Sequence, residues 1–248
     1  MSFLQKKISR VFLDGRVEER TAFFLNERRL LIKVNGNPWA SIVCSDGNLV
    51  DLVAGCLLSF GVIEKKDQIV SIEICPQKIA ASVVLSKEVD CFSTLQKQES
   101  CCPKNKFLEM DDERIPLKKI AKSGFEEKWI FALAKKFAED GDLHRKTSGT
   151  HRCILARNGE AVFEAEDIGR HTAMDKVLGW MLLNDIPASQ ASIFTSGRVP
   201  LDMVEKVVRA GVGVLITKSV PTSQSVQFAK EHGLKLFFRA WPDSYEKV

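Results

Sequence analysis

The stretch ASIFTSGRVPLDMVEKVVRAGVGVLITK, residues 191–218, decides the fold class of this chain. Apolar runs at its two ends are typical of buried strands, and helical spacing from Leu201 to Ala210 lies between them. The pattern continues with a helix from Ser223 to His232 and a strand at 234–238. Strands that alternate with helices indicate a parallel or mixed sheet covered on both faces. The sequence therefore predicts an α/β fold.

The segments upstream predict two hairpins and a further helix. HRCILA and AVFEAE flank Arg157-Asn158-Gly159, and a helix follows at 170–184. Near the N-terminus, RRLLIKVNGNPWASIVC predicts two strands joined at Asn35-Gly36, a favoured hairpin turn.

Between the hairpins, the sequence predicts a buried helix at 49–63, the strands IVSIEIC and KIAASVVLS, and a helix at 129–140 that Gly141 ends. Periodicity disappears from about 87 to 116, and a loop of this length is either functional or disordered. We expect a smaller N-terminal α+β part, residues 1–122, which includes this loop, and an α/β domain, residues 123–248.

Composition excludes several classes of protein. The 248 residues are 45% hydrophobic and 27% charged, which is typical of a globular chain. The formal net charge of +4 is too small to indicate nucleic-acid binding. The sequence shows no signal peptide and no apolar run long enough to span a membrane, so we expect a cytoplasmic protein.

The seven cysteines predict reduced thiols, because their number is odd and no export signal is present. Cys44, Cys56 and Cys75 lie among aliphatic residues, and we expect them in the core. Cys101 and Cys102 differ, because lysines surround them in the polar stretch QKQESCCPKNK. A positive environment favours the nucleophilic thiolate. This pair is either a nucleophile or an incidental surface feature.

Three strand-to-helix junctions, AEDIGRH, TSGRVP and TKSVPTSQ, share small or hydroxylated residues and a basic one. Ligands of α/β sheets bind at the carboxyl ends of strands, where helix N-termini offer free N–H groups. Arg170, Arg198 and Lys218 supply positive charge there. The junctions together predict a site for a phosphate-bearing ligand, although each alone is also typical of an ordinary helix cap.

On the helix that starts at Arg170, His171 and Asp175 share a face. Asp175 could orient the imidazole and Lys176 could pair with a nearby glutamate, or the segment is simply a capped, exposed helix start. No metal site is predicted, because His144, His151 and His171 lack the spacing of a metal-binding motif.

Three segments resemble the formate dehydrogenase accessory sulfurtransferases, the FdhD/NarQ family: IKVNGNPWASIVC, EDIGRHTAMDKVLG and TSGRVPLDMVEKVVRAGVGVLITKSVPTS. The resemblance implies a cytidine-deaminase-like, three-layer α/β/α C-terminal domain and a homodimer. It also implies that sulfur passes as a persulfide from a cysteine desulfurase to the bis(molybdopterin guanine dinucleotide) molybdenum cofactor, before formate dehydrogenase receives that cofactor.

The resemblance also implies site residues. Cys101 and Cys102 correspond to the sulfur-carrying loop, and Thr147, Gly149 and His151 to an upstream block. The cofactor-binding residues implied are Asp167, Gly169, Arg170, His171, Asp175, Lys176, Ser196, Gly197, Arg198, Ser219, Pro221, Thr222, Phe237, Phe238, Arg239, Ala240, Trp241 and Pro242.

The chain departs from the family pattern in the loop. The usual Cys-Gly-x-Cys has Cys102 in place of its glycine and Lys104 in place of its second cysteine. Thr172 replaces an asparagine, Ser148 a glycine, and Arg152 and Cys153 small alanines. Two alternatives stay open: a chaperone that binds the same cofactor without sulfur transfer, which the altered motif favours, and a nucleotide deaminase, which the implied fold suggests although zinc ligands are absent.

Overall fold

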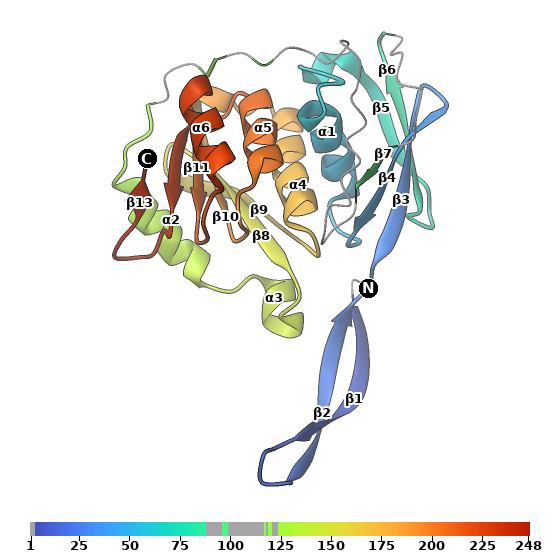
Figure 1. Ribbon diagram of the computed structural model, residues 1–248. Coiled ribbons are helices and arrows are strands. Elements are labelled where there is room, and N and C mark those ends of the chain that lie inside the picture. The colour runs from blue at the N-terminus through green and yellow to red at the C-terminus, as the bar shows by residue number, and fades with distance from the viewer. Residues whose placement is uncertain (1–2, 88–95, 99–116, 118, 121–123) are drawn as a thin grey trace.

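The computed structural model describes residues 3–87, 96–98, 117, 119–120 and 124–248 (Figure 1). Most of the loop predicted at 87–116, with Cys101 and Cys102, lies outside these residues. The proposed boundary between residues 122 and 123 lies outside them as well.

The C-terminal part is built on a six-stranded mixed sheet. Its order is β13-β12-β11-β10-β8-β9, in which β10, β11 and β12 are parallel and β8 is antiparallel to both neighbours. The strands are β8 (His151–Arg157), β9 (Glu160–Asp167), β10 (Ala191–Thr195), β11 (Val214–Thr217), β12 (Lys235–Phe238) and β13 (Glu246–Lys247). The predicted hairpin turn is confirmed, because Asn158 and Gly159 both have positive φ, at 51° and 84°.

Helices cover both faces of this sheet. Helices α4 (Arg170–Leu183), α5 (Leu201–Arg209) and α6 (Ser223–His232) lie side by side on one face (Figure 1), and α2 (Trp129–Ala138) lies on the other. Neighbouring residues of β10 point to opposite faces of the sheet. Ile193 packs with apolar side chains of α4 and α5, and Phe194 packs with those of α2. The predicted three-layer α/β/α arrangement is confirmed.

The N-terminal part has a five-stranded sheet of order β5-β6-β3-β4-β7. Its strands are β3 (Arg28–Val34), β4 (Asn37–Cys44), β5 (Ile69–Ile74), β6 (Ala80–Leu85) and β7 (Gln96–Gln98). Helix α1 (Leu49–Ser59) lies between this sheet and α4 (Figure 1). Short 3-10 turns occur at Lys66–Gln68 and Ala188–Gln190.

The two parts join where α1 crosses α4 on a pair of glycines. A Cβ on Gly55 would overlap the carbonyl oxygen of Asp175, and a Cβ on Gly179 would overlap the carbonyl oxygen of Asp51. The backbones therefore touch with no side chain between them. A single apolar cluster runs through the contact, from Leu30 of the N-terminal sheet to Leu215 of the C-terminal sheet.

Several elements differ from the sequence predictions. Helix α1 ends at Ser59, four residues early, because Gly61 turns the chain with φ 72°. Helix α2 ends at Ala138, and Gly141 instead caps the start of α3 (Asp142–Thr147). The hairpin of β1 (Phe3–Val11) and β2 (Val17–Leu25), which the sequence did not predict, extends away from the body (Figure 1).

Cys44 and Cys56 are buried as predicted, but Cys75 is only half-buried, so its assignment to the core was wrong. It lies in a turn after β5, where its Sγ accepts hydrogen bonds from the amides of Ile79 and Ala80. Within the described ranges, no helix is both long and apolar enough to cross a membrane.

We expect Gly55→Ala to lower the free energy of unfolding by about 3 kcal/mol, because the added methyl group must push α1 and α4 apart. The matched control is Gly47→Ala, since a Cβ on Gly47 meets no atom within 4 Å. Urea unfolding measures both variants. Equal stabilities would show that the crossing tolerates a side chain.

Candidate functional site

The three predicted junctions meet at one edge of the C-terminal sheet. Strands β9, β10 and β11 run in the same direction, so their carboxyl ends and the starts of α4, α5 and α6 lie together. We call this region, with residues 167–171, 196–202 and 218–222, the junction edge. Val199 bridges to Pro221, and the Lys218 amide donates to the Thr195 carbonyl at 3.2 Å, so the second and third junctions are bonded together.

Threonine hydroxyls hold the loop of the second junction. The Thr217 hydroxyl donates to the carbonyl of Gly197 at 2.7 Å. A Cβ on Gly197 would lie 2.9 Å from the Cβ of Arg170, so glycine is what allows the Arg170 side chain to lie across this loop. The third junction ends at Thr222, whose hydroxyl caps α6 at the Ser225 amide.

Three cations of the junction edge are not neutralised by any carboxylate of the described residues. Within the part of the chain that the structure describes, Arg170, Arg198 and Lys218 form no ion pair. The Nε of Arg170 is buried without a hydrogen-bond partner among those residues. Lys218 Nζ lies 5.2 Å from the ring centre of Trp241, which is half-exposed. A buried, unpartnered guanidinium nitrogen is costly, and an anionic ligand would satisfy it.

His151, at the start of β8, lies between the first and second junctions. Its Nδ1 is 3.2 Å from the Ser196 hydroxyl. Burial lowers the pKa of His151, and the positive charges of Arg170 and His171 lower this pKa further. The surroundings of His151 therefore favour the neutral imidazole.

His171 is oriented by Asp202, and the expectation that Asp175 orients it was wrong. His171 Nε2 is 2.8 Å from Asp202 Oδ2. Asp175 instead points between the helices, where it pairs with Lys206 at 2.5 Å and accepts a hydrogen bond from Ser59 at 2.8 Å. An i,i+4 spacing allowed the predicted contact, but the neighbouring helix α5 supplied the closer carboxylate.

Two buried ion pairs lie beneath the junction edge. Lys176 pairs with Asp167 at 2.5 Å, and the exposed fractions of their side chains are 1% and 0%. The second pair is that of Lys206 with Asp175. Lys176 also donates to the Ser45 hydroxyl and to the backbone carbonyl of Glu166, so the predicted pairing with a glutamate side chain was wrong. Asp167, Asp175 and Lys176 are therefore buried in ion pairs that hold α4 against its neighbours next to the junction edge.

The C-terminal segment reaches the same edge. The amides of Arg239 and Ala240 donate to the carbonyls of Ser219 and Thr217, at 3.0 and 3.1 Å. Phe237 and Ala240 are buried, while Trp241 and Pro242 are exposed. Arg239 is engaged by Glu246 at 2.9 Å, so it differs from the unpaired cations beside it.

Glu166, which was not among the predicted site residues, holds the segment that contains Thr147, Gly149 and His151. The Glu166 carboxylate accepts from the amides of Leu143 and His144, both at 2.8 Å, and so caps the short helix α3. Thr147 lies in that helix, Gly149 packs near Leu25, and His151 follows at the junction edge. Among the described residues, no group of three or more His, Cys, Asp or Glu side chains is placed to hold a metal ion.

The model of the FdhD/NarQ family matches residues 25–246. The chain belongs to this family. A sulfur carrier protein FdhD of Staphylococcus haemolyticus is 31% identical over 222 residues, which cover 88% of this chain and 84% of that protein. The sulfur carrier protein FdhD of Staphylococcus aureus (strain MRSA252) has the same identity and coverage.

A crystal structure from Desulfotalea psychrophila, described as that of a formate dehydrogenase accessory protein, aligns with a TM-score of 0.78. The alignment covers 100% of this chain and 97% of that chain, at 24% identity. This likeness supports the fold of this FdhD/NarQ family member, in which the two parts form one body.

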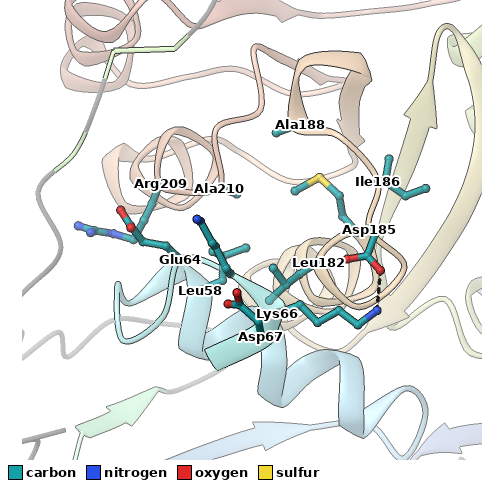
Figure 2. Close-up of a pocket in the computed structure, with 12 residues that line it drawn as sticks. Leu58, Glu64, Lys66, Asp67, Leu182, Asp185, Ile186, Ala188, Arg209 and Ala210 are labelled. Carbon is teal, nitrogen blue, oxygen red and sulfur yellow. Dashed lines mark hydrogen bonds and ion pairs between the residues drawn. The ribbon is translucent and has the colours of Figure 1, made fainter. Parts of the chain in front are cut away.

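A separate pocket of about 580 Å³ lies at the other end of α4 (Figure 2). Leu58, Met181 and Leu182 contribute apolar surface, and Lys66 pairs across it with Asp185 at 2.6 Å. Met181 is eleven residues from Arg170, which corresponds to roughly 17 Å along a helix. None of the site residues predicted from the FdhD/NarQ resemblance lines this pocket.

We expect Lys176→Met to lower the free energy of unfolding by about 3–5 kcal/mol, because it leaves the buried Asp167 carboxylate without a counter-charge. The matched control is Lys66→Met, which breaks an exposed pair and should cost less than about 1 kcal/mol. Chemical denaturation compares the two. A loss at Lys176 no larger than that at Lys66 would contradict a structural role for the buried pair.

Proposed function

We propose that this chain is a sulfur carrier that serves a formate dehydrogenase. Its cargo would be the bis(molybdopterin guanine dinucleotide) molybdenum cofactor, bound at the junction edge. Membership of the FdhD/NarQ family and the relatives named sulfur carrier protein FdhD support the carrier role. The observation that best supports this ligand is the set of cations without an ion pair among the described residues, above all the buried Nε of Arg170.

The chemistry of the junction edge suits a phosphate-rich ligand. Arg170, Arg198 and Lys218 would neutralise phosphate oxygens, and the amides at the starts of α5 and α6 would add donors. The exposed ring of Trp241, with Lys218 beside it, offers a flat surface for a guanine base. The pKa of His151 is lowered by burial first, and a bound phosphate would oppose that effect.

The sulfur would travel on Cys101 or Cys102, which lie outside the described residues. A thiolate of the pair would attack the outer sulfur of a persulfide on a cysteine desulfurase. The outer sulfur moves, the desulfurase thiolate leaves, and no net oxidation occurs. The three buried thiols fit this role poorly: burial raises the pKa of Cys44 and of Cys153 to about 12, and it also raises the pKa of Cys56.

A cofactor-binding chaperone without sulfur transfer is the second candidate. It is favoured by the altered Cys-Gly-x-Cys motif, in which Cys102 and Lys104 replace the usual glycine and second cysteine. The junction edge would serve either function, because Arg170, Arg198 and Lys218 lie outside the cysteine loop in the sequence.

We also propose that the chain assembles as a homodimer. The β1–β2 hairpin supports this, because Val11, Leu13 and Val17 near its tip are exposed. A two-stranded hairpin without further cover is only marginally stable in water, so a second copy packed on it would stabilise it.

Incubation with a cysteine desulfurase and free cysteine should add one sulfur atom to the intact mass of the protein. We expect Cys101→Ser to abolish the gain. The matched control is Cys75→Ser, since Cys75 is a half-buried thiol whose pKa the Ile79 amide and neighbouring amides lower. If only Cys102→Ser abolished the mass gain, Cys102 would be the sulfur-carrying residue in place of Cys101. No added sulfur on the unaltered protein would favour the chaperone.

Guanosine diphosphate is a probe for the junction edge that is independent of sulfur. We expect Arg170→Met and Lys218→Met each to weaken its binding about tenfold, because each removes a charge-assisted contact. The matched control is Lys235→Met, which removes an exposed cation at the opposite end of β12. Calorimetric titration gives the affinities. Equal binding by all three variants would place the ligand elsewhere.

A further inference from the structure

The starts of α4 and α5 are joined by one side-chain contact that no family motif pointed to. His171 and Asp202 are each the second residue of their helix, and His171 Nε2 lies 2.8 Å from Asp202 Oδ2. The exposed fractions of the two side chains are 10% and 20%. The contact is therefore shielded from solvent but lies on the rim of the junction edge.

Both residues lie in the first turn of a helix, where the helix dipole acts in opposite ways on a cation and on a carboxylate. The start of a helix carries partial positive charge, so an imidazolium in the first turn of α4 is repelled, while a carboxylate in the first turn of α5 is stabilised. Arg170 and His171 both lie close enough to His151 for their positive charges to lower its pKa, so this rim is electropositive. Asp202 opposes all of these effects.

The one carboxylate of helix α4 does not compete with Asp202 for His171. Asp175, on the same helix as His171, is already bonded to Lys206 and Ser59. Lys206 lies in α5 and acts on Asp202 as a further cation. Burial would raise the pKa of Asp202, but the hydrogen bond from His171 and the charges of His171 and Lys206 outweigh it and lower this pKa. Asp202 is thus held as a carboxylate.

The contact also determines which ring nitrogen of His171 remains available. Asp202 Oδ1 accepts from the Met203 amide at 2.9 Å, which fixes the carboxylate while Oδ2 receives Nε2. The described residues make no hydrogen bond to Nδ1 of His171. A carboxylate that occupies one nitrogen of an imidazole sets the tautomer and leaves the other nitrogen for the ligand.

We propose that Asp202 is a positioning residue for ligand binding: it holds Nε2 of His171, directs Nδ1 to the junction edge and stabilises the imidazolium that contacts a bound phosphate. This inference rests on the anionic ligand of the proposed function. In addition to that function, the inference assigns to Asp202 the pH dependence of ligand binding. If the contact only linked α4 to α5, a hydrogen bond would be enough, and asparagine could also make it. Stabilisation of an imidazolium needs the negative charge of the Asp202 carboxylate.

The test is the affinity for diguanosine pyrophosphate, measured by calorimetry from pH 5.5 to 8.5. Each phosphate of this probe has one ester and one anhydride bond, so its single acidic group stays ionised throughout that range. We expect binding by the unaltered protein to weaken as pH rises. In Asp202→Asn this decline should occur about one pH unit lower, with an affinity about tenfold weaker at pH 7 that recovers at pH 5.5.

Two variants and one spectrum complete the test. Asp243→Asn removes an exposed carboxylate that is not bonded to His171, and it should follow the unaltered protein. In His171→Asn, removal of Asp202 should have no further effect on the pH profile. Nitrogen chemical shifts at pH 8 should identify Nδ1 as the unprotonated nitrogen of His171, and the opposite tautomer would overturn the inference.

The outcomes separate this inference from the proposed function. Binding by the unaltered protein with the same pH profile in Asp202→Asn, whether or not the affinity falls uniformly, overturns the positioning role alone. Absence of binding by the unaltered protein overturns the anionic ligand, and the positioning role with it.

Discussion

The backbone contact between Gly55 and Gly179 is the constraint on which the rest of the structure depends. It brings α1 against α4 so closely that the carbonyl groups of Asp51 and Asp175 occupy the space where side chains would otherwise lie. Only at this distance can Ser59 of α1 reach the Asp175 carboxylate. The two sheets consequently share one apolar cluster, although they are built from separate stretches of the chain.

Two buried ion pairs help explain why the junction edge is electropositive. Asp167 and Asp175, two of the acidic residues nearest the edge in sequence, are turned inward and neutralised by Lys176 and Lys206. Buried pairs of this kind need good geometry and further hydrogen bonds to offset desolvation, and Ser45 and Ser59 provide them. With these carboxylates occupied, Arg170, Arg198 and Lys218 remain without an acidic partner among the described residues, and the local field favours an anion.

Particular residues show how far the sequence predicted this arrangement. The alternation of strands and helices from Ala191 onward predicted the sheet, and the three basic junctions predicted an edge that attracts anions. Sequence spacing could not predict the partner of His171. Both Asp175 and Asp202 have a carboxylate that could accept a hydrogen bond from His171. Asp202 is the one that does so, because α5 lies beside α4. Cys75 was misplaced for a similar reason, because its neighbours are apolar but its turn faces solvent.

By itself, the sequence determined the local structure: positive-φ turns at Asn35-Gly36 and Asn158-Gly159, the apolar strands, the helix starts and the cations that follow them. These features depend on residues within one turn or one strand, where chain connectivity already sets the geometry. Only the tertiary structure decided which charges are buried in pairs and which remain at the junction edge. That choice depends on distances between segments more than a hundred residues apart, such as Ser45 and Asp167, and on the desolvation that their contact imposes.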